Sequence, residues 1–192
     1  LVSRLLLRSM SRAVYSTECI GHFGLAAKYY CHFTSPIRRY PDLQIHRIIK
    51  DDLRGRLEKG GRIAGYARML PAVASQSSSM EQRAQEVERE AVKLKKAEYM
   101  MEHLGEEYDG VISGVTGWGF YVELPNTVEG LVHIMSLRDD YYEFDEENYQ
   151  LVGEVTGRRF CMGQKVRIRV KDAAPANRTI DFVLSGESDS IE

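Results

Sequence analysis

The sequence predicts an α+β protein in which a helical region precedes a small β-barrel. Up to about Leu104, apolar residues recur every three or four positions, which is the period of one helix face. From Tyr108 onward, short segments of alternating apolar and polar residues are separated by glycines, as in strands joined by turns. Five such segments favour the five-stranded Greek-key barrel called the OB fold. We therefore assign residues 1–105 to a helical domain, residues 106–185 to the barrel and residues 186–192 to a disordered polar tail.

The chain starts inside a helical pattern. One helix face collects the apolar residues Val2, Leu5, Leu6, Met10, Ala13 and Val14, and no capping residue precedes them. We therefore expect the chain to be the C-terminal portion of a longer protein, with a processed or wrongly placed start as the alternative.

The last helix before the barrel is expected over residues 79–104. Ser78, followed three residues later by Glu81, has the pattern of a capping box at a helix start. Gly105 is expected to end the helix as its C-cap.

The expected strands share glycine-marked ends and alternating apolar residues, and they occupy residues 110–113, 119–123, 128–134, 164–170 and 179–184. Successive side chains on a strand point to opposite faces. We therefore assign Phe120 to the core and Tyr121 to the outer face. A long insertion separates the third and fourth strands and holds six acidic residues between Asp139 and Glu147, which we expect to point away from any ligand.

The net charge of −2 hides an uneven distribution. Residues 1–70 carry a net charge of +8, residues 71–105 carry −1 and residues 106–192 carry −9. A basic segment is the electrostatic signature of contact with nucleic-acid phosphates. The charge pattern therefore favours a nucleic-acid partner for the first part of the chain, whereas the acidic second part is less expected for such a protein.

Cysteine usage and hydropathy indicate a cytoplasmic protein. Cys19, Cys31 and Cys161 are far apart and form neither a zinc-ligand spacing nor a disulfide framework, which favours a reducing compartment. No apolar run approaches the length that spans a bilayer, and no segment has the pattern of a signal peptide. We expect no membrane partner.

One short run concentrates the residues of an anion site. Residues 32–42, HFTSPIRRYPD, place Arg38 and Arg39 just before Pro41, and proline is tolerated in the first turn of a helix. A helix N-terminus offers free N–H groups and a positive dipole end, and arginine forks bind phosphate in a fixed geometry. The run therefore predicts a phosphate site. The alternative is a structural helix entry with solvated arginines.

Several motifs in order resemble one enzyme family. The segments are HFTSPIRRYPDLQIHR at residues 32–47, GHFGLA at 21–26, EYDGVISGVTGWGFYVEL at 107–124 and VEGLVHI at 128–134. Together they resemble the ribonuclease II and ribonuclease R family of processive 3′→5′ exoribonucleases. The resemblance implies that residues 1–105 are the α-helical end of an RNB catalytic domain, and that residues 106–185 are an S1-type OB fold.

The resemblance also implies an activity. Such enzymes hydrolyse RNA to nucleoside 5′-monophosphates with two divalent metals, here Mg²⁺, held by aspartates that lie upstream of the matching segment. No metal ligand is assigned in this chain, which is therefore expected to be inactive by itself. Arg38 is the implied catalytic residue, contacting the scissile phosphate and stabilising charge in the transition state. The implied substrate is single-stranded RNA or RNA with a 3′ overhang, bound by a monomer.

The remaining site residues are expected to bind RNA. Ser35 and Arg39 belong to the phosphate run, and Arg39 either contacts a neighbouring phosphate or pairs with Asp42, which we favour slightly. The S1 resemblance implies that three residues stack on bases and two are polar partners near the last strand; these are Trp118, Tyr121, His133, Asp172 and Arg178. Stacking on aromatic side chains is the usual basis of single-strand binding by OB folds. The alternative for Trp118 is that it packs under a loop.

Two other functions remain open. The first is a stand-alone single-stranded RNA-binding module without catalysis, and the second is an inactive homologue that acts as a partner-binding scaffold. We interpret His22, His32 and His46 as core or capping residues, and the pair Asp51 and Asp52 as surface residues.

Overall fold

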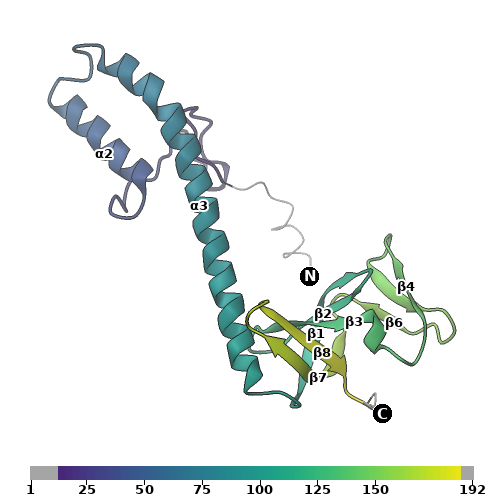
Figure 1. Ribbon diagram of the computed structural model, residues 1–192. Helices are drawn as coiled ribbons and strands as arrows, with labels where there is room; N and C mark the ends of the chain where they lie inside the picture. The colour runs from purple at the N-terminus through teal and green to yellow at the C-terminus, as the bar shows by residue number, and fades with distance from the viewer. Residues whose placement is uncertain (1–12, 187–192) are drawn as a thin grey trace. The chain divides into compact units, whose positions relative to one another are not determined.

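The computed structural model describes residues 13–186 of the 192-residue chain. The chain divides into two compact units at the bond between Val87 and Glu88. The long helix α3 (Arg62–Met101) contributes residues to both units (Figure 1). Apart from α3, the first unit is built from helices and loops and the second mainly from strands, which confirms the predicted α+β class.

The first unit contains the short helix η1 (Phe23–Leu25), helix α2 (Tyr40–Leu53) and the first part of α3. Helix α2 begins where the proline predicts, with Arg39 as its N-cap and Pro41 in its first turn. The helix expected at the start of the chain lies outside the described residues, except for Ala13 and Val14, which form no regular structure.

The predicted capping box does not start a helix, because α3 begins at Arg62 and continues through the serine-rich stretch. The Ser78 hydroxyl donates a 2.9 Å hydrogen bond to the carbonyl oxygen of Ala74, one turn earlier. The same hydroxyl accepts a hydrogen bond from the backbone N–H of Tyr15 at 2.9 Å. Ser78 is therefore satisfied as a helix-interior serine, and its spacing to Glu81 has no capping role.

Helix α3 ends at Met101, before the expected end at Leu104, so Gly105 lies in the turn after the helix and is not its C-cap. Gly105 follows the helix with a φ of 82°, a conformation that favours glycine, and the chain then enters the first strand. Near this end, Ala97 and Met100 are fully buried and belong to the same hydrophobic core as the strands. The last turns of α3 therefore form part of the barrel's core.

Five strands close into a barrel in the order β1 (Glu107–Thr116), β2 (Gly119–Glu123), β3 (Glu129–His133), β8 (Thr179–Leu184) and β7 (Lys165–Ala174). Strands β3 and β8 pair in parallel, and the other neighbours are antiparallel. These are the five strands that the sequence predicts. Closure leaves no free sheet edge in this barrel.

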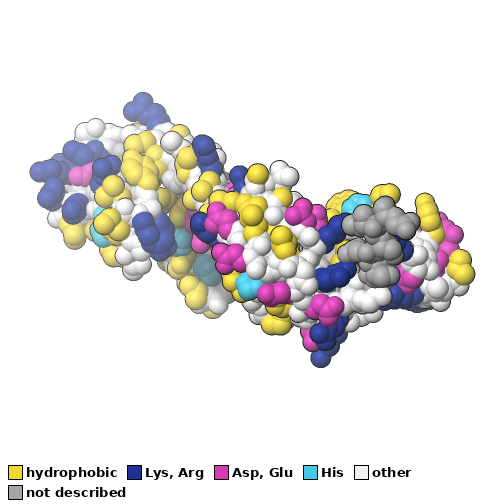
Figure 2. All heavy atoms as spheres, turned by 60° about the horizontal axis from the view of Figure 1, so that its bottom comes forward, with side chains coloured by type: hydrophobic (Ala, Val, Ile, Leu, Met, Phe, Trp, Pro, Cys, Tyr) yellow, Lys and Arg dark blue, Asp and Glu magenta, His cyan; other side chains and the backbone are white. Residues whose placement is uncertain are grey.

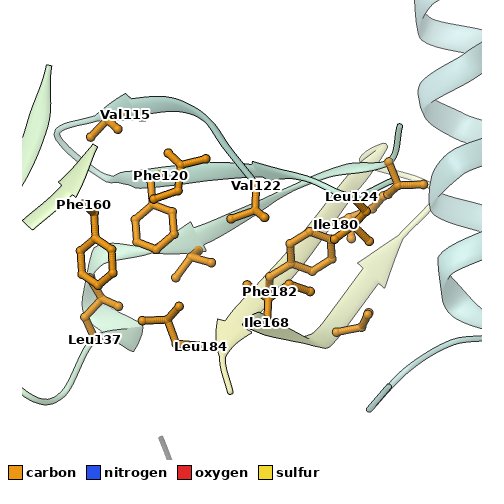
Figure 3. Packing of buried hydrophobic residues seen from close by; sticks show 14 of the residues in the cluster. Val115, Phe120, Val122, Leu124, Leu137, Phe160, Ile168, Ile180, Phe182 and Leu184 are labelled. Atoms are coloured by element: carbon orange, nitrogen blue, oxygen red, sulfur yellow. The ribbon is translucent and has the colours of Figure 1, made fainter. Parts of the chain in front are cut away.

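Aromatic and branched side chains fill the barrel. Phe120 is fully buried, and its ring lies against that of Phe160 with the centroids 4.7 Å apart (Figure 3). Phe182 and Ile168 continue the core along the barrel axis (Figure 3). Tyr121, the next residue on β2, is only half-buried. The predicted inward direction of Phe120 is therefore confirmed.

The insertion between β3 and β7 forms a second, three-stranded sheet that was not predicted. Its strands are β4 (Tyr142–Asp145), β5 (Gln150–Gly153) and β6 (Arg159–Cys161). These strands have three or four residues each, so none is long enough to show alternation in the sequence. Leu151 and Phe160 are fully buried and anchor this sheet on the barrel core.

Aspartates of the insertion hold its turns. The Asp140 carboxylate accepts hydrogen bonds from the backbone N–H groups of Val155 and Thr156, and from the Thr156 hydroxyl at 2.6 Å. These bonds lower the pKa of Asp140 to about 2. Asp145 accepts from the N–H groups of Glu147 and Asn148, and Asp139 pairs with Arg158 at 2.7 Å. These three carboxylates therefore have partners within the insertion.

The first prediction concerns Gly119, which has a φ of 145° at the start of β2. A Cβ there would overlap the carbonyl oxygen of Val132 and lie 3.0 Å from the His133 Cα. We expect Gly119→Ala to lower the free energy of unfolding by about 2–4 kcal/mol in urea titrations followed by circular dichroism. Gly117→Ala is the matched control, because no atom lies within 4 Å of its Cβ position. Equal midpoints for the two variants would contradict this account.

The second prediction concerns the pH dependence of the insertion. The folded-state pKa of Asp140 is about 2, below its ordinary value of 3.8. The stability that its carboxylate contributes is therefore complete above about pH 4 and is lost as the pH falls towards 2. We expect Asp140→Asn to lower the urea midpoint at pH 7, and the difference from the unmodified chain to shrink as the pH approaches 2. A difference that does not change with pH would show that the ionised form is not what matters.

Candidate nucleic-acid interface

A compact turn precedes helix α2. The carbonyl oxygen of Ser35 accepts hydrogen bonds from the N–H groups of Arg38 at 3.2 Å and Arg39 at 3.0 Å. The N–H of Ser35 in turn donates to the Asp42 carboxylate at 2.8 Å. The turn is thus fixed at both ends by hydrogen bonds, and it leads directly into the first turn of α2.

Asp42 is the anchor of this turn. Its side chain is fully buried, and the same Oδ2 oxygen accepts from Arg39 Nε at 3.1 Å and Nη2 at 2.8 Å. Burial by itself raises the pKa of Asp42, but the Ser35 N–H and the Arg39 guanidinium outweigh it and hold the pKa below its ordinary value. Of the two roles weighed for Arg39, the ion pair with Asp42 is the one present in the structure.

Arg38 differs from its neighbour. It is exposed, and within residues 13–186 its guanidinium has no hydrogen-bond or ion-pair partner. Ile37, beside it in the turn, is 98% exposed. Because the Arg39 charge is matched by Asp42, the unmatched positive charge of the turn is that of Arg38, and its fork of N–H donors is available to a phosphate.

The three histidines of this unit have structural partners. His32 Nδ1 lies 3.1 Å from the Tyr15 hydroxyl. His46 Nε2 lies 2.9 Å from the carbonyl oxygen of Phe33, and the two rings stack with centroids 4.2 Å apart. His22 caps η1 by accepting from the N–H of Leu25. The structural interpretation of these residues is confirmed.

The interpretation of Asp51 as a surface residue is wrong. Asp51 is buried, and its carboxylate accepts hydrogen bonds from Arg62 Nη1 at 2.6 Å and from the Tyr66 hydroxyl at 2.9 Å. The sequence pattern missed this because both partners lie on α3, more than ten residues away.

The exposed cations Arg54, Arg56 and Lys59 lie in the connection that follows α2, and Figure 2 shows Lys and Arg side chains gathered at one end of this unit.

On the barrel, the predicted stacking residues lie in the turn between β1 and β2 and on the hairpin formed by β2 and β3. Trp118 lies in the turn between β1 and β2 and is 55% exposed, so its indole does not pack under a loop. His133 is exposed at the end of β3, and it pairs in register with Gly119, next to the tryptophan. Tyr121 pairs with Leu131 on the same hairpin. The structure therefore brings Trp118, Tyr121 and His133 together.

Asp172 lies on the same outer surface. It follows a bulge in β7 and is exposed, and its carboxylate accepts from the N–H of Ala173 at 2.8 Å. Register pairs connect Tyr121 to Leu131, Leu131 to Asp181, and Asp181 to Asp172. Directly opposed residues face the same side of a sheet. Three successive register pairs thus connect Asp172 on β7 to Tyr121 on β2, and these residues face the same side of the sheet.

Arg178 was predicted to be a polar partner of RNA, and in the structure it forms an ion pair with another residue of the chain. It lies in the turn between β7 and β8 with a φ of 58°, and its guanidinium donates to the Glu90 carboxylate of α3. Glu90 also pairs with Lys93 at 2.8 Å, and both bonds lower the pKa of Glu90. One guanidinium nitrogen of Arg178 is thus engaged by Glu90. No local pattern could predict this pair, because 88 residues separate the partners.

Across the described part of the chain, no three His, Cys, Asp or Glu side chains come together in a way that could hold a metal ion. Among the same residues, no helix has both the length and the apolar character needed to cross a bilayer.

Comparison with known proteins gives the two units separate matches. Residues 1–55 match the model of the RNB domain, and residues 103–185 match that of the S1 RNA binding domain. Ribonuclease R 1 of Lactococcus lactis is 47% identical over 192 residues, which is all of this chain and 23% of that protein. Ribonuclease R of Escherichia coli is 42% identical over 96% of this chain and 24% of that protein. The chain thus spans about a quarter of the length of these curated relatives.

Solved structures give the same result. The apo form of Mycoplasma genitalium RNase R superposes with a TM-score of 0.86 and 27% identity, over 94% of this chain and 28% of that one. The same enzyme in complex with ribose methylated single-stranded RNA gives a TM-score of 0.86 and 28% identity, with the same coverage. In sequence and in fold, the chain corresponds to the end of the RNB domain and the S1 domain of ribonuclease R.

Proposed function

We propose that this chain supplies the phosphate-clamping arginine and the RNA-binding barrel of a processive 3′→5′ exoribonuclease that releases nucleoside 5′-monophosphates. The observation that carries the proposal is the turn anchored by Asp42, which leaves Arg38 exposed and unmatched within a segment that matches the RNB domain. The relatives that share this segment are ribonucleases R.

The role of Arg38 follows from its surroundings. Asp42 holds both Ser35 and Arg39, so the turn keeps one conformation while the Arg38 guanidinium stays accessible. A guanidinium held in this way contacts the scissile phosphate and stabilises the charge that develops on it in the transition state. Preorganisation of the turn saves the cost of ordering it when the substrate arrives.

Mg²⁺, the cofactor that the resemblance implies, does not fit the residues described here. One carboxylate oxygen of Asp42 and one of Asp51 accept from arginine, tyrosine or backbone donors, and no cluster of three candidate ligands exists in residues 13–186. We therefore assign no step of hydrolysis to these residues beyond the phosphate contact of Arg38.

The barrel provides affinity for single-stranded RNA or a 3′ overhang. Trp118 and His133 are exposed and Tyr121 is half-buried on neighbouring parts of β2, β3 and the turn before β2, and Asp172 extends this surface across the sheet. Bases stack on such aromatic side chains whatever their sequence. We place the protein in the cytoplasm, where exposed cysteines such as its three stay reduced, and we propose that it acts as a monomer.

A second candidate function is RNA binding by this chain without catalysis. The closed barrel with its exposed tryptophan favours it, because this surface needs no metal and is complete within the second unit. The two functions differ in one observable property: both predict binding of RNA, but only the first predicts degradation once the rest of an RNB domain is supplied.

The third prediction tests Arg38 in a chimaera in which this chain replaces the matching residues of the Lactococcus lactis relative. We expect Arg38→Ala to lower the single-turnover rate of RNA trimming about 100-fold or more, because it removes a charge contact made in the transition state. RNA affinity should change much less. The readout is the release of nucleoside 5′-monophosphates with Mg²⁺ present.

Arg47→Ala is the matched control, because Arg47 is an exposed cation on α2, the helix that follows the turn of Arg38. It should leave the rate within about twofold, as expected for a surface charge far from the reacting phosphate. Near-normal trimming by the Arg38 variant would sink the catalytic role. A chimaera that binds RNA and never trims it would favour the second function.

The fourth prediction tests the barrel in this chain as it stands. We expect Trp118→Ala to weaken binding of a labelled oligoadenylate about tenfold or more, since stacking contributes about 1–3 kcal/mol per base. Tyr141→Ala removes an even more exposed aromatic residue from the insertion and should have little effect. Fluorescence anisotropy measures both. Unchanged affinity after loss of Trp118 would show that the assigned surface is wrong.

A further inference from the structure

Met135 is an exposed apolar side chain that neither the core nor the assigned binding residues explain. It lies at the centre of η2 (Ile134–Ser136), immediately after β3, and is 82% exposed. Single exposed apolar residues are common on protein surfaces and need no function. What singles out Met135 is its position beside Trp118.

Two backbone contacts hold these neighbours together. The N–H of Ile134 donates to the carbonyl oxygen of Trp118 at 2.9 Å. The backbones are so close here that only glycine fits at position 119, where any Cβ would overlap the chain entering η2. The residue before Met135 is thus hydrogen-bonded to Trp118 itself, and the two exposed side chains project from adjoining turns.

The turn that carries Met135 is held by its own hydrogen bonds. His133 Nδ1 accepts from the Met135 N–H at 3.2 Å, and the Ser136 hydroxyl donates to the His133 carbonyl oxygen at 2.6 Å. The side chain of Leu137, which follows, is buried, and its N–H donates to the carbonyl oxygen of Ile134 at 3.1 Å. The backbone of Met135 is therefore fixed while its side chain remains in solvent, so little order has to be gained on binding.

We propose that Met135 and Trp118 form one apolar contact surface for an unpaired RNA base, with the base on the indole and the thioether against the same nucleotide. This inference rests on the proposed RNA-binding function and deepens it by adding a residue that sets affinity. A thioether is polarizable and adapts its shape, and it contacts aromatic rings favourably. Such contacts act on any base, so Met135 raises affinity without selecting a sequence.

The test uses this chain and a fluorescein-labelled oligoadenylate of about 12 nucleotides, a length within the site sizes of OB folds. We expect Met135→Ser to weaken binding about three- to tenfold. Val155→Ser is the matched control, because Val155 is 89% exposed in the insertion and has no assigned contact. Both side chains lie in solvent, so neither variant should shift the urea midpoint.

A double-mutant cycle shows whether Met135 and Trp118 act on the same nucleotide. If they do, Met135→Ser should weaken binding less in the Trp118→Ala background than in the unmodified chain. Equal effects in the two backgrounds would overturn the shared surface. No effect of Met135→Ser in the unmodified chain would overturn the inference altogether.

Oxidation by hydrogen peroxide gives a second measurement that needs no variant. Bound oligoadenylate should slow sulfoxide formation at Met135 severalfold in peptide mass spectra, whereas Met101, which is half exposed at the end of α3, should oxidise at the same rate. If RNA binds and Trp118→Ala weakens it while Met135 stays unprotected, only this inference fails. If the unmodified chain binds no RNA, the proposed function fails with it.

Discussion

Carboxylates that accept hydrogen bonds from backbone N–H groups hold irregular segments in both units, including the turn on which the proposed role of Arg38 depends. Asp42 binds the N–H of Ser35 and fixes the arginine turn, while Asp140 and Asp145 do the same for turns of the insertion. Bonds from N–H donors to a charged acceptor are stronger than those between neutral groups. Loops gain a single conformation in this way without a hydrophobic core of their own.

This use of acidic residues explains how an acidic second half is compatible with an RNA partner. Residues 106–192 carry a net charge of −9, yet Asp139, Asp140 and Asp145 are engaged within the insertion, and Glu90 on α3 is paired with Arg178 and Lys93. Charge matched at close range contributes little to the field felt by a phosphate beyond a Debye length. The unmatched guanidinium of Arg38 therefore counts for more than the net charge of the chain.

Periodicity was sufficient where the physics is local. Alternation predicted the five barrel strands and the inward Phe120, and the position of Pro41 predicted where α2 begins. Periodicity failed where the environment of a side chain is determined by a partner far along the chain. Ser78 has a capping pattern but is satisfied inside α3, and Asp51 is covered by Arg62 and Tyr66. The insertion's three strands are too short for any pattern, and the pair between Arg178 and Glu90 has no local signature.

The N-terminal boundary of the barrel also depends on contacts between residues that are far apart in the sequence. The motifs of the S1 segment start only after α3 has ended. Ala97 and Met100 of α3 are nevertheless fully buried with the barrel's core residues. Without these side chains, part of that core would face water, at a cost of about 25 cal/mol for each Å² of apolar surface exposed. The pair of Arg178 with Glu90 joins the same helix to the turn between β7 and β8. The last turns of α3 are thus a structural part of the barrel, because they complete its core and hold Arg178 at the turn between β7 and β8.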